Sequence, residues 1–136
     1  MVDYAVTASS VAPGTNAVIR RGTAGAAAIT AGQSVRLSAG TLVLAQADSS
    51  ANVSGFLGVS LNDGAPGQPV NYIESGEYNS GATATAGDVA VISAAAAGGI
   101  APVADLVSTN AVVVVGVFTT TTNIRLIDSG DAVVKG

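Results

Sequence analysis

The side chains that could do chemistry in this chain are carboxylates and hydroxyls, because the sequence contains no His and no Cys. The usual proton carrier near neutral pH and the usual zinc ligands are therefore missing. Glu74 and Glu77 could form the carboxylate pair of a glycosidase. Residues three apart on a strand point to opposite faces, however, and Gly76 interrupts the stretch. A solvated strand end is the preferred interpretation.

A second carboxylate pair, Asp128 and Asp131, flanks the dipeptide Ser129-Gly130. Such oxygens suit Ca²⁺, but the spacing of a calcium loop is absent, and a turn is favoured. No glycine-rich stretch continues into the Lys and helix of a phosphate loop, and no Ser lies in a nucleophile elbow. The sequence therefore predicts a protein that is not an enzyme and that uses no metal and no cofactor.

Charged side chains are scarce, at 10% of the 136 residues, against about 25% in an ordinary domain. A large neutral surface keeps molecules apart poorly, which indicates contact with other proteins; a small-residue surface that simply stays in solution is the alternative. The only basic cluster, Arg20-Arg21, is too small for nucleic acid. Residues 1–30 carry two Arg and one Asp, a net charge of +1, whereas residues 31–136 carry three basic and eight acidic residues, a net charge of −5. The leading segment is therefore suited to an acidic neighbour.

The pattern of apolar residues predicts an all-β protein. Its clearest strand signal is the stretch from Ala111 to Ile127, which opens with the β-branched run Val112–Val115 and has a Gly at 116 that permits a bulge or a close backbone approach. Mean hydropathy is +0.53, but polar residues interrupt every apolar run before the about 20 residues of a membrane span. We also expect no signal peptide. Helix candidates are limited to one or two turns around residues 94–97 and 104–107.

The chain also repeats itself. Thr30-Ala31-Gly32 before Val35 matches Thr85-Ala86-Gly87 before Val89, and three further matches follow in the same order. They are Leu44-Ala45 with Ile100-Ala101, Leu57-Gly58-Val59 with Val115-Gly116-Val117, and Ile73-Glu74-Ser75-Gly76 with Ile127-Asp128-Ser129-Gly130. We interpret residues 30–76 and 85–130 as similar β-units that bury their faces against each other in one barrel or sandwich. Residues 17–136 would then form this domain, preceded by an extended arm, residues 1–16.

The repeated pattern resembles the head decoration (cement) proteins of tailed phages. The resemblance covers roughly residues 17–130 and rests on five short motifs: Ala31-Gly32-Gln33-Ser34-Val35, Gly58-Val59, Pro66-Gly67-Gln68-Pro69-Val70, Ala86-Gly87-Asp88-Val89 and Gly116-Val117. It implies a small β-barrel or tulip-like domain and a homotrimer on the outer surface of the virion capsid. Such a trimer would bridge subunits of the major capsid protein. This sequence departs from the family in its low charge and in Thr119–Thr122, which replaces the Pro-Gly turn of the first unit.

The resemblance leads to two sets of candidate residues. The arm would dock on the capsid and Arg20 and Arg21 would pair with capsid carboxylates; the alternatives are a disordered arm and a solvated turn. The apolar strand faces would form the core or the trimer interface. The capsid-contact candidates are Val2, Tyr4, Val6, Val11, Arg20 and Arg21, and the trimer or core candidates are Val112, Val114, Val117 and Phe118. We expect no nucleic-acid or membrane partner. A β-domain of a bacterial surface or adhesin protein is the alternative function.

Overall fold

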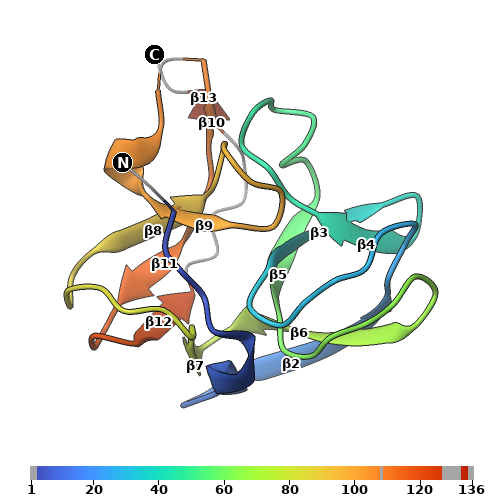
Figure 1. Ribbon diagram of the computed structural model, residues 1–136, viewed down its shortest axis with the longest axis horizontal. Coiled ribbons are helices and arrows are strands. Elements are labelled where there is room, and N and C mark those ends of the chain that lie inside the picture. Colours follow the sequence, from blue (N-terminus) through green and yellow to red (C-terminus); the bar gives the residue numbers. More distant parts are fainter. Residues whose placement is uncertain (1–2, 108, 127–132, 135–136) are drawn as a thin grey trace.

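The computed structural model describes residues 3–107, 109–126 and 133–134. Within them the chain is built from short antiparallel strands (Figure 1), which confirms the predicted all-β fold. The helical elements of the described residues are two single 3-10 turns, η1 (Ala8–Ser10) and η2 (Val103–Asp105). The helix candidate around residues 94–97 is wrong, because this stretch is the loop between two strands.

The first sheet has five strands in the order β2-β6-β5-β3-β4, and all its neighbouring strands are antiparallel. Their bounds are β2 (Val18–Thr23), β3 (Ser34–Ser38), β4 (Thr41–Leu44), β5 (Phe56–Ser60) and β6 (Pro69–Ser75). The sheet curls so that the chain after β2 reaches β4, where Ala24 forms an isolated parallel bridge with Leu42. Gly22 and Thr23 continue β2 up to this bridge, so residues 22–24 run in an extended conformation.

The second sheet has six strands in the order β1-β7-β12-β11-β8-β9. Their bounds are β1 (Ala12–Pro13), β7 (Glu77–Asn79), β8 (Val89–Ile92), β9 (Ile100–Pro102), β11 (Val114–Phe118) and β12 (Asn123–Leu126). A separate two-stranded pair joins β10 (Ala111–Val112) to β13 (Val133–Val134). Strand β1 comes from the expected arm, so residues 12–13 belong to the folded sheet.

The two sheets use the same strand order. Numbered along the chain, the strands of the first sheet lie in the order 1-5-4-2-3, and so do the strands of the second sheet when β1 is left aside. This shared topology is what two copies of one β-unit would produce. The sheets lie side by side in Figure 1 and are connected directly, since β6 ends at Ser75 and β7 begins at Glu77.

Each sheet carries a β-bulge at the same place. In the first sheet the pairing of β3 with β5 skips Leu57, the residue before Gly58, and in the second sheet the pairing of β8 with β11 skips Val115, the residue before Gly116. A Cβ atom on Gly58 would lie 1.9 Å from the Ile73 carbonyl oxygen, so only Gly fits there. The bulge or close approach predicted at Gly116 is confirmed, and the same device recurs at Gly58.

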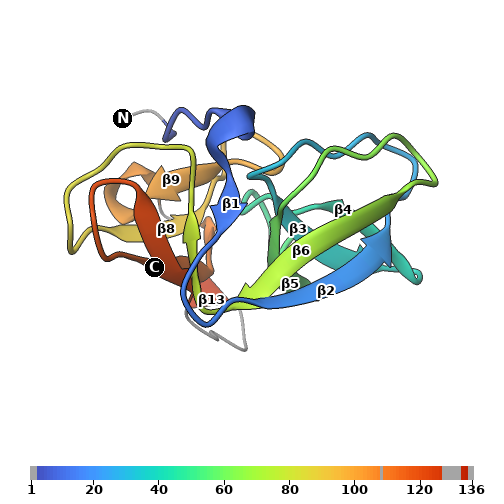
Figure 2. The ribbon, with the colours of Figure 1, turned by 90° about the horizontal axis from the view of Figure 1, so that it is seen from below.

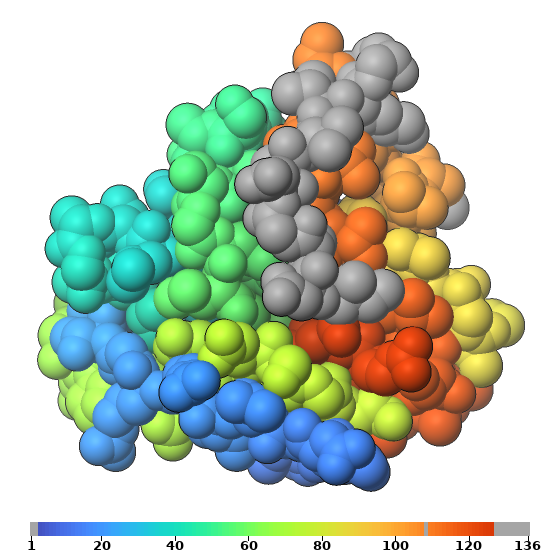
Figure 3. Space-filling view, turned by 180° about the vertical axis from the view of Figure 1, so that it is seen from behind, coloured from blue at the N-terminus to red at the C-terminus, as the bar shows by residue number. Residues whose placement is uncertain are grey.

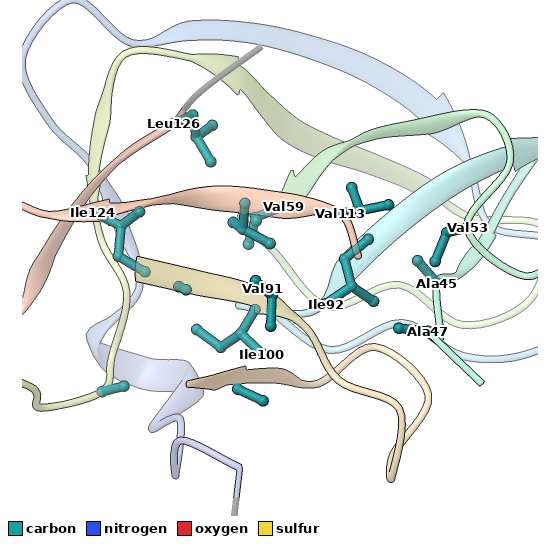
Figure 4. Packing of buried hydrophobic residues seen from close by; sticks show 14 of the residues in the cluster. Ala45, Ala47, Val53, Val59, Val91, Ile92, Ile100, Val113, Ile124 and Leu126 are labelled. Atoms are coloured by element: carbon teal, nitrogen blue, oxygen red, sulfur yellow. The ribbon is translucent and has the colours of Figure 1, made fainter. Parts of the chain in front are cut away.

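A hydrophobic core joins the two sheets. It contains fully buried side chains from the second sheet together with Val59 and Ile73 of the first sheet and Ala45, Ala47 and Val53 of the loop between β4 and β5. Figure 4 shows Val59 beside Val91 of β8 in this shared core. The first sheet also encloses a small core of its own, made by Ala24, Ile29, Val35, Leu42 and Val70. The two sheets therefore depend on each other for burial.

Candidate interaction surface

Strand β2 exposes apolar and basic side chains together. Its burial pattern is exposed at every position except Gly22, and Val18 and Ile19 retain 40% and 46% of their accessible surface. Side chains alternate along a strand, so Ile19, Arg21 and Thr23 share the side of β2 opposite to Gly22, which lies against the buried Leu42. We call the exposed side chains of Ile19, Arg21 and Thr23 the β2 face; Val18 is also exposed but lies on the opposite side of the strand. Figure 2 shows β2 and β6 running together along the near side of the molecule, and Figure 3 shows β2 at the surface from another direction.

The two arginines of β2 have different surroundings. The Nε of Arg20 donates a hydrogen bond of 2.7 Å to Oε2 of Glu74 on β6. This hydrogen bond and the negative charge of Glu74 raise the pKa of Arg20. Arg21 lies on the other side of the strand, is exposed, and has no ion pair within the part of the chain that the structure describes. Arg20 is therefore compensated within the molecule, and Arg21 carries the free positive charge of the β2 face.

The arm does not project from the domain at the residues the structure describes. The Tyr4 N–H donates to the Ile100 carbonyl at 3.0 Å, and the Thr7 N–H donates to the Gly81 carbonyl at 2.8 Å. The Tyr4 ring packs edge-on against Phe118 with the ring centroids 5.2 Å apart. Figure 1 shows this segment along the seam between the two sheets. The candidate Val2 lies outside the described residues.

The other arm candidates lie at the same seam. Val6 and Val11 are partly buried against the shared core, as is Tyr4, and the Cβ position of Gly32 would lie 2.6 Å and 2.9 Å from their methyl groups. The sequence could not show this contact, because three apolar residues spread over a Ser- and Ala-rich segment indicate neither a strand nor its neighbour. A capsid contact through these side chains would require their release from the core.

A cleft of about 310 Å³ lies beside the arm, between the turn at residues 30–33 and the loop at residues 96–99. Asp3 lines it, and Oδ2 of Asp3 accepts a hydrogen bond of 2.6 Å from the Ser93 hydroxyl. Its Oδ1 is buried and has no partner in the described part of the molecule. Asp3 is the one carboxylate among the described residues that line the cleft, so this lining contains neither a pair of acids nor a set of metal ligands.

The trimer or core candidates of β11 and its preceding strand are divided between core and periphery. Phe118 is 1% exposed, and Val112 and Val114 pack at the edge of the shared core. Val117 is partly buried and lies between Arg125 and Val89 in the sheet. The strand thus contributes mainly to the interior of the molecule.

Polar side chains that could contact a ligand are used to close four turns. In the first, the Thr30 N–H donates to the Gln33 side chain at 2.8 Å while the Gln33 N–H donates to the Thr30 carbonyl at 3.3 Å. The same pair of bonds closes the turns that end at Gln68, Asp88 and Asn110. Three of these turns have Gly at the third position with a positive φ: Gly32 (+88°), Gly67 (+83°) and Gly87 (+99°). The motifs that carry the family resemblance therefore include these turns, whose Gly requirement is conformational.

The remaining carboxylates and the buried phenol also serve the fold. Oε1 of Glu77 accepts a hydrogen bond of 2.9 Å from the Thr119 hydroxyl, and Glu74 is occupied by Arg20. The Tyr78 hydroxyl is fully buried, has no hydrogen-bond partner among the described residues, and has its pKa raised by burial. No group of three or more Asp or Glu in the described part of the chain is arranged to hold a metal ion. The pair Asp128 and Asp131 lies outside the described residues.

Comparison with known proteins gives no family for this chain: no family model matches it, and no curated protein is similar to it at a significant level. No helix in the described residues is long and apolar enough to cross a membrane.

Proposed function

We propose that this chain is a capsid decoration, or cement, protein of a tailed phage. It attaches to the outer surface of the head and stabilises it by bridging subunits of the major capsid protein. The work it does is adhesion, without a chemical step. In this proposal the protein acts as a homotrimer on the virion and binds neither nucleic acid nor membrane.

One observation carries the proposal furthest. The polar side chains of the resemblance motifs close turns, as Gln33, Gln68 and Asp88 do, while strand β2 leaves Val18, Ile19 and Arg21 exposed. Aliphatic side chains beside an Arg are a composition that protein interfaces use, since Arg is enriched at interfaces and its guanidinium pairs with carboxylates. The molecule thus offers a contact surface in place of a reaction site.

In the proposed mechanism each copy of the protein acts as a rigid body. The turns are closed by their own side chains, the shared core fixes one sheet against the other, and the arm is seated along their seam. A rigid wedge of this kind resists separation of the proteins it touches because little conformational entropy is lost when it binds. Such a wedge suits a shell that must withstand internal pressure.

The test uses phage heads that lack this protein. They are purified from a phage in which the gene for this chain has been deleted. Wild-type protein added back should pellet with the heads, saturate a fixed number of sites, and appear as density on the outer surface by electron cryomicroscopy. It should also raise the temperature at which the heads release their DNA. A chain that neither pellets with heads nor protects them would refute the proposal.

The same experiment with purified heads distinguishes the alternative function, a β-domain of a bacterial surface or adhesin protein. Such a module would be monomeric, would not bind phage heads, and would be encoded within a longer exported chain.

A further inference from the structure

Strand β2 leaves one edge of the first sheet open. It is the end strand in the order β2-β6-β5-β3-β4, and it contains no proline. The strand at the other end, β4, is partly covered, because the Gly25 N–H donates to the Leu42 carbonyl at 2.9 Å. The end strands of the second sheet, β1 and β9, contain Pro13 and Pro102. Among the end strands of these two sheets, β2 therefore has neither kind of protection against pairing with a further strand.

The register shows which backbone groups of β2 face outward. Arg21 lies opposite Asn71 of β6. Asn71 uses both of its backbone groups on its far side, since its N–H donates to Oδ1 of Asn62 at 2.7 Å and its carbonyl accepts from the Leu61 N–H at 2.8 Å. Opposed residues of antiparallel strands alternate between exchanging hydrogen bonds and pointing away from each other. The N–H and C=O of Arg21 therefore point away from β6, as do those of Ile19 two residues earlier, and no residue in the described part of the chain hydrogen-bonds these four groups.

The side chains along this edge favour an acidic partner strand. Arg21 is exposed and has no ion pair among the described residues, whereas Arg20, on the opposite side of β2, is held by Glu74. Ile19, which is 46% exposed, lies on the same side as Arg21. A carboxylate opposite Arg21 and an apolar side chain opposite Ile19 would both stabilise an added strand, because directly opposed side chains lie about 4.5–5.5 Å apart. Pairing with β2 of a second copy is disfavoured, because it would bring arginines together.

We propose that the outer edge of β2 accepts an extended acidic segment of the capsid protein as an additional strand of the first sheet. The backbone groups of Ile19 and Arg21 supply two hydrogen-bond donors and two acceptors to that segment, and the Arg21 side chain selects a carboxylate on it. The inference deepens the proposed function by naming the contact that holds the capsid protein, and it rests on that function only for the source of the segment.

The first experiment measures amide hydrogen exchange of the whole chain by NMR. In the free protein the Ile19 and Arg21 amides should exchange freely, whereas those of Arg20 and Gly22, which face β6, should be protected. The probe is a blocked peptide of about six residues, the usual length of a strand, in which Val and Glu alternate. At a peptide concentration about four times its dissociation constant, exchange at Ile19 and Arg21 should slow about fivefold. A counterpart with Lys in place of Glu should bind at least about threefold more weakly.

Variants separate the contribution of the backbone from that of the charge. Arg21→Pro removes the outward N–H and should abolish peptide binding, and proline is tolerated there because this N–H makes no bond within the sheet. Arg21→Gln keeps the N–H and should lose the preference for the Glu peptide. Arg125→Gln is the matched control and should keep that preference, because Arg125 is exposed on β12, a strand that is paired on both sides. Circular dichroism melts establish that each variant is folded; if Arg21→Pro is not, the two glutamine variants decide.

The same variants are then added to phage heads that lack the protein. Folded Arg21→Pro should bind the heads at least about tenfold more weakly than wild type, and Arg125→Gln should bind within about twofold of wild type. Three results would overturn the inference: protected Ile19 and Arg21 amides in the free chain, equal slowing or none with the two peptides, or head binding by folded Arg21→Pro as tight as that of wild type. The last result would leave the cement function standing. A wild-type chain that does not bind heads, but whose exchange is slowed by the Glu peptide, would refute the cement function and leave strand addition at β2 standing.

Discussion

Substituting Ala for Gly58 should destabilise the fold far more than the same change at an open glycine. The added Cβ would lie 1.9 Å from the Ile73 carbonyl oxygen, whereas real Cβ atoms essentially never approach a heavy atom closer than 3.0 Å. The backbone of β6 would therefore have to retreat by about 1 Å, which is overpacking of a kind that the neighbouring chain cannot relieve by a rotamer change. The retreat also disturbs the pairing of Val59 with Ile73 and of Ser60 with Tyr72.

The magnitude follows from these two costs. Overpacking costs typically 1–3 kcal/mol, and a weakened backbone hydrogen bond adds about 1 kcal/mol, so we expect a loss of about 3 kcal/mol in the free energy of unfolding. Gly116→Ala should cost a similar amount, because its Cβ would lie 2.2 Å from the Arg125 carbonyl oxygen. Gly67→Ala is the matched control: its Cβ would meet nothing within 4 Å, and only its φ of +83° is unfavourable, for about 1 kcal/mol.

Urea unfolding followed by circular dichroism measures all three variants. With a slope of about 2 kcal/mol per molar urea, the midpoint should fall by about 1.5 M for Gly58→Ala and Gly116→Ala and by about 0.5 M for Gly67→Ala. Equal midpoints for Gly58→Ala and Gly67→Ala would refute the close approach at the bulge. A large loss at Gly58 with none at Gly116 would refute the equivalence of the two bulges.

Three further changes probe single features. Thr109→Gly should raise the free energy of unfolding by about 1 kcal/mol, because Thr109 holds a φ of +81° in the turn where its three counterparts have Gly; a lower urea midpoint would contradict this. Tyr78→Phe should stabilise by about 1 kcal/mol, since it removes a buried hydroxyl without a partner. Burial raises the pKa of Tyr78 in the folded state. The stability that goes with keeping this phenol neutral is therefore complete below the unfolded pKa of about 10 and is lost as pH rises above it. In thermal melts at alkaline pH, the melting temperature should fall less steeply with pH for Tyr78→Phe than for wild type. Tyr4→Ala should cost about 2 kcal/mol by removing the edge-on ring contact with Phe118, and a melt unchanged from wild type would show that the arm is not part of the fold.

The strand content of the protein could be predicted because β-branched residues dominate it. The run Val112–Val115 is too rich in Val to favour a helix, and the Gly that follows it marks the bulge. The pattern could not separate core from surface in this run, because Val113 and Val115 are buried while Val112 and Val114 are partly exposed. Burial there depends on the strands that flank β11, which are β8 and β12, and no local pattern specifies them.

The sequence reveals the repeat, but it does not show which residues of the two units occupy equivalent positions. Matching residue types aligns Val35 with Val89, whereas the pairing across the bulge places Val35 opposite Gly58 and Ala90 opposite Gly116. Val35 therefore corresponds to Ala90 in the two sheets. The turn glycines Gly32 and Gly87 keep the same spacing to these residues. The turn glycines therefore give the correct alignment of the two units, although the side chains at the aligned strand positions differ.

The candidate interaction surface was only partly accessible to sequence reasoning. Arg20 and Arg21 stand out as the one basic cluster, but their different roles depend on Glu74, which is 54 residues away along the chain. The position of Tyr4 depends in the same way on Phe118. Contacts between distant segments decide which apolar and charged side chains remain at the surface, and a single sequence without a strand register does not contain that information.

The edges of the second sheet bear on how such a weakly charged protein avoids pairing with strands of other molecules. β1 contains Pro13, which has no N–H, β9 ends at Pro102, and the Tyr4 N–H already occupies a carbonyl of β9. Open strand edges recruit strands from other molecules into fibrils, and proline and short strands prevent this. With little electrostatic repulsion between molecules, these protected edges would supply most of the protection against amyloid-like polymerisation at high protein concentration.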